Sequence, residues 1–284
     1  MRRLINKCFL SLVSRKITDI RLSSVKKKQV TAVSRVEVVC IAKYEDPYIE
    51  EWVRYNLKLG FDHVTVYDNG LTLRWLPSRF PGQVTVVPWG GASQQIPAYN
   101  DFLARRSDED MWAAFIDIDE FIVLKRHPDI KLLISECSAG HGGALAINWV
   151  FYGSNGHLEQ TYQPVTQRFT RRGLGIDQHV KCIAYIPHVA SMDIHCPALK
   201  ASYVQYDCDG RVFSGPFNKL GNLDIARINH YFTKSLAEFR EKVARGRADT
   251  LTPRSLSEFA GADQNDVEDT SALDFLSDHT KTVF

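Results

Sequence analysis

The sequence predicts an α/β fold in which helices flank a mostly parallel sheet. The chain has 284 residues, 44% hydrophobic and 24% charged, which is typical of a globular protein with one large core. From residue 36 onward, short β-branched runs alternate with amphipathic helical patterns, as in successive β-α-β units. Acidic residues directly follow a buried strand-like run at 112–116. The pattern loosens after residue 153, where no long strand is expected, so we expect an irregular C-terminal half.

The first predicted strand covers 36–42, and a helix follows it from Asp46. Pro47 suits the first helical position, and Gly60 ends the helical pattern. Further strands are predicted over 63–67, 84–87, 112–116 and 144–150, with another helix over 94–106.

The last predicted helix begins at Ser235, which forms a capping box with Glu238, and it ends at Gly246. Residues 251–284 are acidic and poorly periodic, and we interpret them as a weakly packed tail. The expected organisation is therefore a basic arm over 1–35, one domain over 36–250 and the tail.

The arm over 1–35 contains ten Lys or Arg and a single acidic residue, although the net charge of the whole chain is only +2. Apolar residues interleave with these charges at helical spacing, so two roles are open: a solvated arm, or peripheral contact with a membrane through residues 1–30. Nucleic acid is not an expected partner, because Phe9 is the arm's one aromatic residue and gives no stacking pattern.

No apolar stretch in the sequence reaches the roughly 18 to 20 residues of a membrane-spanning helix, so no such span is predicted. Arg15 and Lys16 interrupt the short apolar run at 8–13, which argues against a secretory signal and favours a cytoplasmic protein at, or away from, the inner membrane face. The six cysteines show no C-x-x-C spacing, which argues against a zinc ribbon, a redox dithiol or a disulfide scaffold.

Polar residues follow three of the predicted strands. In open α/β sheets ligands bind beyond the carboxyl ends of the strands, so these residues should meet in one crevice. Asp117 and Asp119 should point to the same side if the strand stays extended, and hard carboxylate oxygens favour Mg²⁺ or Mn²⁺. The alternative is a strand-end turn with solvated acids. The other residues of the predicted crevice are Lys43, Tyr44, Glu45, Asp68 and Asn69.

The sequence contains neither G-x-G-x-x-G after the first strand nor G-x-x-x-x-G-K-[ST], so it supports neither a dinucleotide oxidoreductase nor a P-loop NTPase. A nucleotide is instead expected to place its base over the first two strand ends and its diphosphate on the metal.

Several ordered blocks resemble the family 2-like and family 92 glycosyltransferases of the GT-A fold, over about residues 36 to 247. The blocks are AKYEDPYIEEW from Ala42, YDNG from Tyr67, FIDIDEF from Phe115, NWVFYGSNGH from Asn148 and NHYFTKS from Asn229. The resemblance implies a hexosyltransferase of polysaccharide or glycoconjugate biosynthesis. It would move a sugar from a nucleotide-diphosphate sugar, expected to be a UDP-sugar, to a glycan acceptor, with a divalent metal bridging the D-x-D acids and the diphosphate. Family members usually carry Asn in place of Tyr44, and Ser-Thr-Asp in place of 71–73.

The resemblance also implies a late histidine in the metal shell, for which His195 and His230 are the candidates; a structural role is the alternative for each. Lys234 could then meet a phosphate. In such an enzyme Asp119 would hold the metal, and Asp117 the metal or the ribose. An inverting transfer needs a base; Glu120, Asp177 and Asp193 are candidates, and Asp193 is placed among the catalytic residues.

The loop over 149–157 combines aromatic residues with small polar ones, which suits the apolar face of a sugar ring, so we assign it to sugar contact. The alternative is that its first aromatic residues belong to the core. Lys181 could line the site or pair with an acid. The loop residues assigned to sugar contact are Trp149, Phe151, Gly153, Ser154 and His157.

Two other functions fit parts of the pattern. A haloacid-dehalogenase-like phosphatase would use Asp117 as its nucleophile, but its motif usually opens the domain, whereas about 80 residues of α/β pattern precede it here. A non-catalytic carbohydrate-binding protein would keep the aromatic loop and would tolerate the loss of Asp119.

Overall fold

The computed structural model describes residues 33–138 and 143–278, so the predicted roles of the arm over 1–30 lie outside the described residues. The strands are β1 (Val36–Ala42), β2 (His63–Asp68), β3 (Val84–Pro88), β4 (Trp112–Phe115), β5 (Glu120–Leu124), β6 (Ala144–Phe151), β7 (Arg171–Arg172), β8 (Val180–Tyr185), β9 (Val189–Met192), β10 (Pro197–Leu199), β11 (Gln205–Tyr206), β12 (Val212–Phe213), β13 (Ala226–His230) and β14 (Val267–Glu268). The helices are α1 (Asp46–Leu59), α2 (Leu76–Arg79), α3 (Gln95–Arg106), α4 (Ile130–Cys137), α5 (Val165–Arg168), η1 (Ile186–His188), α6 (Leu236–Arg245), α7 (Ser257–Ala262) and α8 (Ser271–Ser277).

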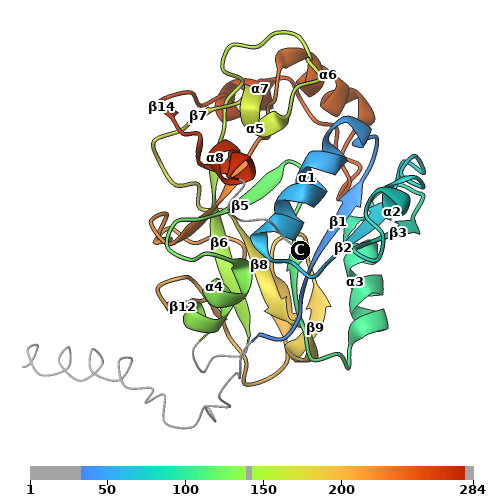
Figure 1. Cartoon of the computed structure of the whole chain (residues 1–284), viewed down its shortest axis with the longest axis vertical. Coiled ribbons are helices and arrows are strands. Elements are labelled where there is room, and N and C mark those ends of the chain that lie inside the picture. Colours follow the sequence, from blue (N-terminus) through green and yellow to red (C-terminus); the bar gives the residue numbers. More distant parts are fainter. Residues whose placement is uncertain (1–32, 139–142, 279–284) are drawn as a thin grey trace, which may run out of the picture.

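The predicted α/β class with a mostly parallel sheet is confirmed. One large sheet runs in the order β12-β11-β6-β8-β4-β1-β2-β3, and β13 joins it by pairing with both β6 and β5. Strands β4, β1, β2 and β3 are mutually parallel. β8 is antiparallel to both of its neighbours, β4 and β6. Helices cover both faces of this sheet (Figure 1), and apolar side chains on its two faces form two separate core clusters.

The regular first half forms where the sequence predicts it. β1 has the predicted bounds, and α1 starts at Asp46 and ends at Gly60, which adopts a left-handed conformation with φ 103°. The capping box of Ser235 and Glu238 at the start of α6 is also present. β8 and β13, with six and five residues, are the main difference, because no long strand was expected between 153 and 230.

Helix α1 holds the acidic strand end in place. The indole of Trp52 donates to the carbonyl of Glu120 at 2.9 Å, and the hydroxyl of Tyr55 donates to the carbonyl of Ile122 at 2.8 Å. Both aromatic side chains are fully buried. These bonds fix the start of β5, and therefore the turn that precedes it, against a rigid helix.

The interpretation of residues 251–284 as a weakly packed tail is wrong for the part that the structure describes. β14 pairs with β7, and Ala262 and Ala272 are buried. Asp269 accepts hydrogen bonds from Arg172 and Arg227. Asp269 therefore anchors this segment to two arginines of the body.

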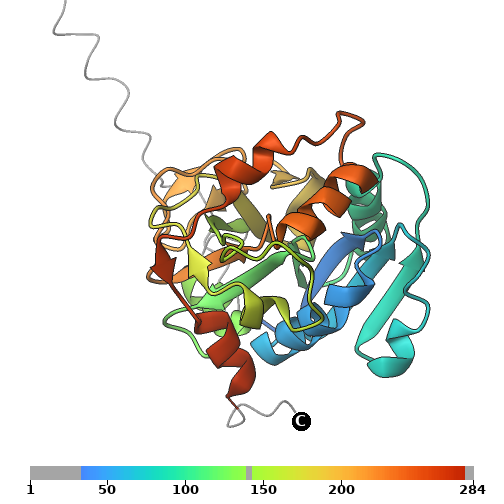
Figure 2. The ribbon, with the colours of Figure 1, turned by 90° about the horizontal axis from the view of Figure 1, so that it is seen from above.

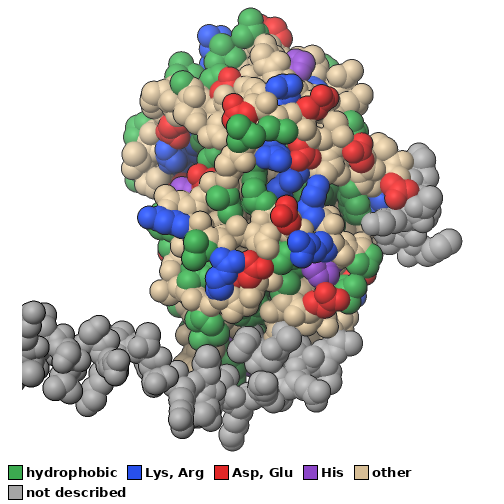
Figure 3. Space-filling model, turned by 90° about the vertical axis from the view of Figure 1, so that its left-hand side faces the viewer, with side chains coloured by type: hydrophobic (Ala, Val, Ile, Leu, Met, Phe, Trp, Pro, Cys, Tyr) green, Lys and Arg blue, Asp and Glu red, His purple; other side chains and the backbone are tan. Residues whose placement is uncertain are grey.

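Helices α6 and α7 and the segment between them lie at one end of the sheet, above β1 and β5 in Figure 1, and the view from above in Figure 2 shows the same segment crossing that end. Basic and acidic side chains are interspersed on the face drawn in Figure 3. No described helix is both long and apolar enough to cross a bilayer. Cys40, Cys137, Cys182, Cys196 and Cys208 are free thiols.

Candidate active site

A cavity of about 390 Å³ lies between the strand ends and the C-terminal segment. Its walls come from the ends of β1, β4, β6 and β13 on one side, and from the end of α6 and the segment that follows on the other. Among the residues predicted for the site, it is lined by Lys43, Glu45, Asp117, Asp119, Trp149, His195 and His230. Two of the three predicted strand ends, those of β1 and β4, therefore meet in one crevice.

The D-x-D segment is a turn rather than an extension of the strand. β4 ends at Phe115, and the amide of Glu120 donates to the carbonyl of Asp117 at 3.0 Å. The carboxylate of Glu120 in turn accepts from the amide of Asp117 at 2.9 Å. The expectation that Asp117 and Asp119 point to the same side is wrong, because the turn directs the two carboxylates to different cations.

Asp117 is held by the floor of the cavity. Its carboxylate accepts a hydrogen bond from the ammonium of Lys181 at 3.0 Å. It also accepts one from the side-chain amide of Gln95, at the start of α3, at 2.7 Å. Lys181 is fully buried and also lies 3.9 Å from Glu120. Burial alone would lower the pKa of Lys181, but Asp117 and Glu120 raise it above its usual value, so the lysine is charged. Of the two roles considered for Lys181, the structure shows the ion pair.

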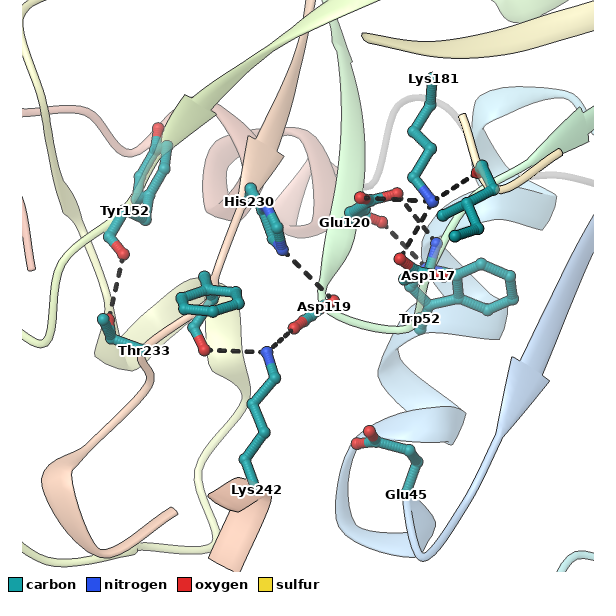
Figure 4. A network of polar contacts seen from close by, with 12 residues as sticks. Glu45, Trp52, Asp117, Asp119, Glu120, Tyr152, Lys181, His230, Thr233 and Lys242 are labelled. Carbon is teal, nitrogen blue, oxygen red and sulfur yellow. Dashed lines mark hydrogen bonds and ion pairs between the residues drawn. The ribbon is translucent and has the colours of Figure 1, made fainter. Parts of the chain in front are cut away.

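Asp119 is engaged from the opposite side. Its carboxylate lies 2.5 Å from the ammonium of Lys242 on α6 and 3.7 Å from Nε2 of His230 at the end of β13 (Figure 4). Burial alone would raise the pKa of Asp119, but Lys242 and His230 hold it well below its ordinary value. Burial lowers the pKa of His230. Asp119 is therefore an anion beside a neutral imidazole.

Two of the four predicted metal ligands come together. Within the described residues, no group of three or more His, Cys, Asp or Glu side chains is arranged to hold a metal ion. Asp117 is turned to Lys181, and Nδ1 of His195 is bonded to the carbonyl of Val180 at 3.0 Å. Asp119 and His230 remain adjacent, and Nδ1 of His230 is buried without a hydrogen-bond partner. An ionised carboxylate and a neutral, uncommitted imidazole suit a divalent cation whose other ligands are phosphates and water.

Trp149 lies among three histidines at the centre of the cavity. Its ring stacks on His179 with centroids 5.0 Å apart, and lies 5.2 Å from His195 and 4.4 Å from His230. It is only 8% exposed, yet it lines the cavity. Trp149 is therefore a mostly buried residue of the core that also lines the cavity, and its contact with a sugar stays a prediction. Phe151, two residues on, packs behind His230 with centroids 5.4 Å apart.

His195 makes the stability of the fold depend on pH. Burial has the largest effect on the pKa of His195 and the charge of Lys181 the second largest, and together they lower it to about 4. The pKa of a histidine in an unfolded chain is about 6.5. Between these values the unfolded state binds more protons, so the free energy of unfolding falls as pH falls from 6.5 towards 4. We expect a loss of about 2 kcal/mol at pH 5 relative to pH 7.5 from this group.

Urea denaturation at the two pH values measures this loss. His195→Gln should reduce the pH dependence, whereas His63→Gln, at an exposed site beside Thr85, should leave it unchanged. Equal pH dependence in the His195 variant and the wild type would contradict the assignment.

The end of β2 shapes a turn and does not line the cavity. Asp68 accepts from the amide of Leu73 at 2.8 Å, and Asn69 donates to the carbonyls of Trp89 and Gly91 at 2.7 and 2.9 Å. Tyr44 is 57% exposed outside the main cavity, although Lys43 and Glu45 on either side of it line the wall.

The small polar residues of the predicted sugar loop pack against the C-terminal segment instead of the cavity. The amide of Ser154 donates to Asp263 at 2.6 Å, and a side chain in place of Gly153 would meet Asn265. The ring of His157 packs edge-on against Phe169. The contact with Asn265 explains Gly153, because the C-terminal segment approaches its backbone closely, whereas Gly156 adopts a left-handed conformation with φ 77°.

Two further predicted residues lie outside the cavity. Lys234 is buried with its ammonium 4.3 Å from the ring centre of Tyr48, in a smaller neighbouring pocket. Asp193 is exposed, and its carboxylate accepts from the amide of Ile194 at 2.7 Å.

The cavity-lining residues that sequence reasoning missed include a histidine and four basic residues: His179, Lys242, Arg245, Arg247 and Arg254. The basic residues follow one another at the end of α6 and just beyond it, a cluster that the sequence does show. The spacing of His179 two residues after Asp177 was the available signal for the histidine, since such spacing allows a local hydrogen bond.

Residues 37–213 match the model of glycosyltransferase family 92. The chain belongs to glycosyltransferase family 92. A family 92 protein of Arabidopsis thaliana is 25% identical over 175 residues, covering 56% of this chain and 30% of that protein, so the chain matches less than a third of this relative's length. A solved structure of 4-diphosphocytidyl-2C-methyl-D-erythritol synthase aligns with a TM-score of 0.34 and 15% identity, covering 57% of this chain and 83% of that one.

Proposed function

We propose that this chain transfers a sugar from a nucleotide-diphosphate sugar, expected to be a UDP-sugar, to a glycan or glycoconjugate acceptor in a metal-dependent reaction. One observation supports this above the others: in a chain of family 92, Asp119, His230 and Trp149 line the same cavity beyond the strand ends. That place in an open α/β sheet is where ligands bind.

The divalent cation would be held by Asp119 and His230. The ammonium of Lys242, which is paired with the Asp119 carboxylate in the structure, would have to move away from it. When bound, Mn²⁺ or Mg²⁺ supplies a Lewis acid for the charge that develops on the departing phosphates. The turn that holds Asp119 is already fixed by Trp52 and Glu120, so the carboxylate needs little reorganisation. Asp117, bound to Lys181 and Gln95, faces the donor side and is assigned to the ribose.

Trp149 is assigned to the sugar. The exposed part of its ring lies among histidines that donate or accept hydrogen bonds, and an aromatic face with nearby polar groups suits the C–H face of a sugar.

His179 is the best placed base for the acceptor. Its Nδ1 lies 2.6 Å from the carboxylate of Asp177, which also accepts from the amide of His179 at 2.9 Å. The ring is thereby fixed, with Nε2 left for a substrate, and the side chain is 34% exposed in the cavity wall. In the proposed step the acceptor oxygen forms a bond to the sugar carbon as the bond to phosphate breaks, and its proton passes to Nε2.

The other candidate bases are less suited. Asp193 does not line the cavity. Glu120 is completely buried, and burial raises its pKa well above the ordinary value despite the opposing charge of Lys181. A haloacid-dehalogenase-like phosphatase would need further acids for its metal, and two candidates from the C-terminal segment are used in packing: Asp263 accepts from the amide of Ser154, and Asp269 accepts from two arginines.

A thermal-shift panel of nucleoside diphosphates and their sugars tests the function. With Mn²⁺ present and ligand at about 100 times its dissociation constant, the folded form should gain about 2.7 kcal/mol, which corresponds to roughly 5–10 °C in Tm. Inorganic phosphate and free nucleosides are the controls. If no nucleotide-diphosphate sugar shifts Tm with either Mn²⁺ or EDTA, the proposed function is wrong.

A further inference from the structure

A cluster of cationic side chains forms the C-terminal wall of the cavity, beyond the region that matches the family. Arg245 ends α6, and Arg247 and Arg254 follow it; all three line the cavity, as does Lys242. The family match ends at residue 213.

Arg247 and Arg254 have few acidic partners, although Asp249, which lies between them in the sequence, also lines the cavity. Arg247 and Arg254 share a single carboxylate, that of Glu258, at 2.8 and 3.2 Å. The Nε atoms of both arginines are buried and have no hydrogen-bond partner. Burial, as the largest cause, and the charge of Arg247, as the second, lower the pKa of Arg254. Unsatisfied buried donors and crowded like charges both cost free energy, which an added anion would recover.

The neighbouring cations are already engaged elsewhere. Arg245 pairs with Glu45 and donates to the carbonyl of Lys43 at 3.1 Å, while Lys242 pairs with Asp119. The ring of Phe232 lies under Arg254, with 4.9 Å between the guanidinium carbon and the ring centre. This contact holds the guanidinium plane at the wall without using any of its hydrogen-bond donors.

We infer that Arg247 and Arg254 form an anion site that holds the diphosphate of the donor. This inference rests on the proposed function. Guanidinium groups bind phosphate oxygens through paired hydrogen bonds, and two of them match the two phosphates of a diphosphate. Arg254 packs on the ring of Phe232, which lies 5.3 Å from the ring of His230, so the site supplies positive charge beside the residues proposed to hold the cation. Binding of the diphosphate portion therefore does not require the metal.

Calorimetric titration of the full chain with inorganic pyrophosphate in EDTA tests the site. The wild type should bind one pyrophosphate per chain, and Arg247→Gln/Arg254→Gln should weaken binding by about tenfold or more, because charge-assisted hydrogen bonds are lost. Arg240→Gln, at an exposed arginine on the preceding helix α6, should bind as the wild type does. If the double variant fails to fold, each single variant should show a smaller loss of the same sign.

A competition experiment tests whether pyrophosphate and nucleoside diphosphates bind at the same site. Nucleoside diphosphates should displace pyrophosphate from the wild type in EDTA. Absence of pyrophosphate binding, or equal binding by the double variant and Arg240→Gln, would overturn the inference; if nucleoside diphosphates still bind with Mn²⁺ in that case, the proposed function stands. Pyrophosphate binding without any nucleotide binding would instead contradict both the proposed function and the donor as the site's ligand.

Discussion

Asp119→Asn should lower the release of nucleoside diphosphate from the donor by about 10²–10³-fold. The substitution keeps the size of the side chain but removes the charge that, in the proposed site, holds the cation beside His230. It also leaves the ammonium of Lys242, whose side chain is 11% exposed, without its anionic partner. We therefore expect a further loss of about 3 kcal/mol in the free energy of unfolding.

The two effects can be separated with a second substitution. Asp119→Asn/Lys242→Met removes both charges, so it should recover most of the lost stability while the activity stays low. Asp108→Asn, at an exposed position before β4, is the matched control and should change neither quantity. Recovery of activity together with stability in the double variant would show that Asp119 acts only in folding.

His179→Gln should lower turnover of the donor by about 10²–10⁴-fold, the range expected when a general base is removed. The side-chain amide that the substitution introduces can still bond to the carboxylate of Asp177. The stability of the protein and its binding of the nucleoside diphosphate should therefore change little.

Asp177→Asn is the companion variant. It leaves His179 in place but removes the carboxylate at 2.6 Å that orients the ring, so we expect a smaller loss of turnover than for His179→Gln. His63→Gln controls for the loss of a histidine elsewhere in the sheet. Unchanged turnover in His179→Gln, measured alongside unchanged nucleotide binding, would reject this residue as the base.

The regular first half of the fold could be predicted because its signals are local. Pro47 and Gly60 mark the two ends of α1, and the apolar run from Val36 is buried along its whole length in β1. β8 and β13 could not be predicted in the same way. Their partners lie far away in the sequence: β8 pairs with β4 and β6, and β13 with β5 and β6, so nothing local fixes them.

The site was predictable to a similar extent. The strand ends of an open α/β sheet must share one edge, which brought Lys43, Asp117 and Asp119 to the same cavity. The partners of those carboxylates were not predictable, because Lys181 and Lys242 come from a distant strand and a distant helix. The turn at Asp117 also depends on the buried carboxylate of Glu120, whose role only the three-dimensional packing reveals.

The two walls of the cavity have separate origins in the chain. Asp117 and Asp119 lie inside the stretch shared with family 92, whereas Arg247, Arg254 and Glu258 lie after it. If Arg247 and Arg254 hold the diphosphate as inferred, substitutions after α6 should change the affinity for this shared portion of all such donors while the acidic turn stays constant. Exchanging residues 246–258 between relatives should then change pyrophosphate binding without changing the turn at Asp117.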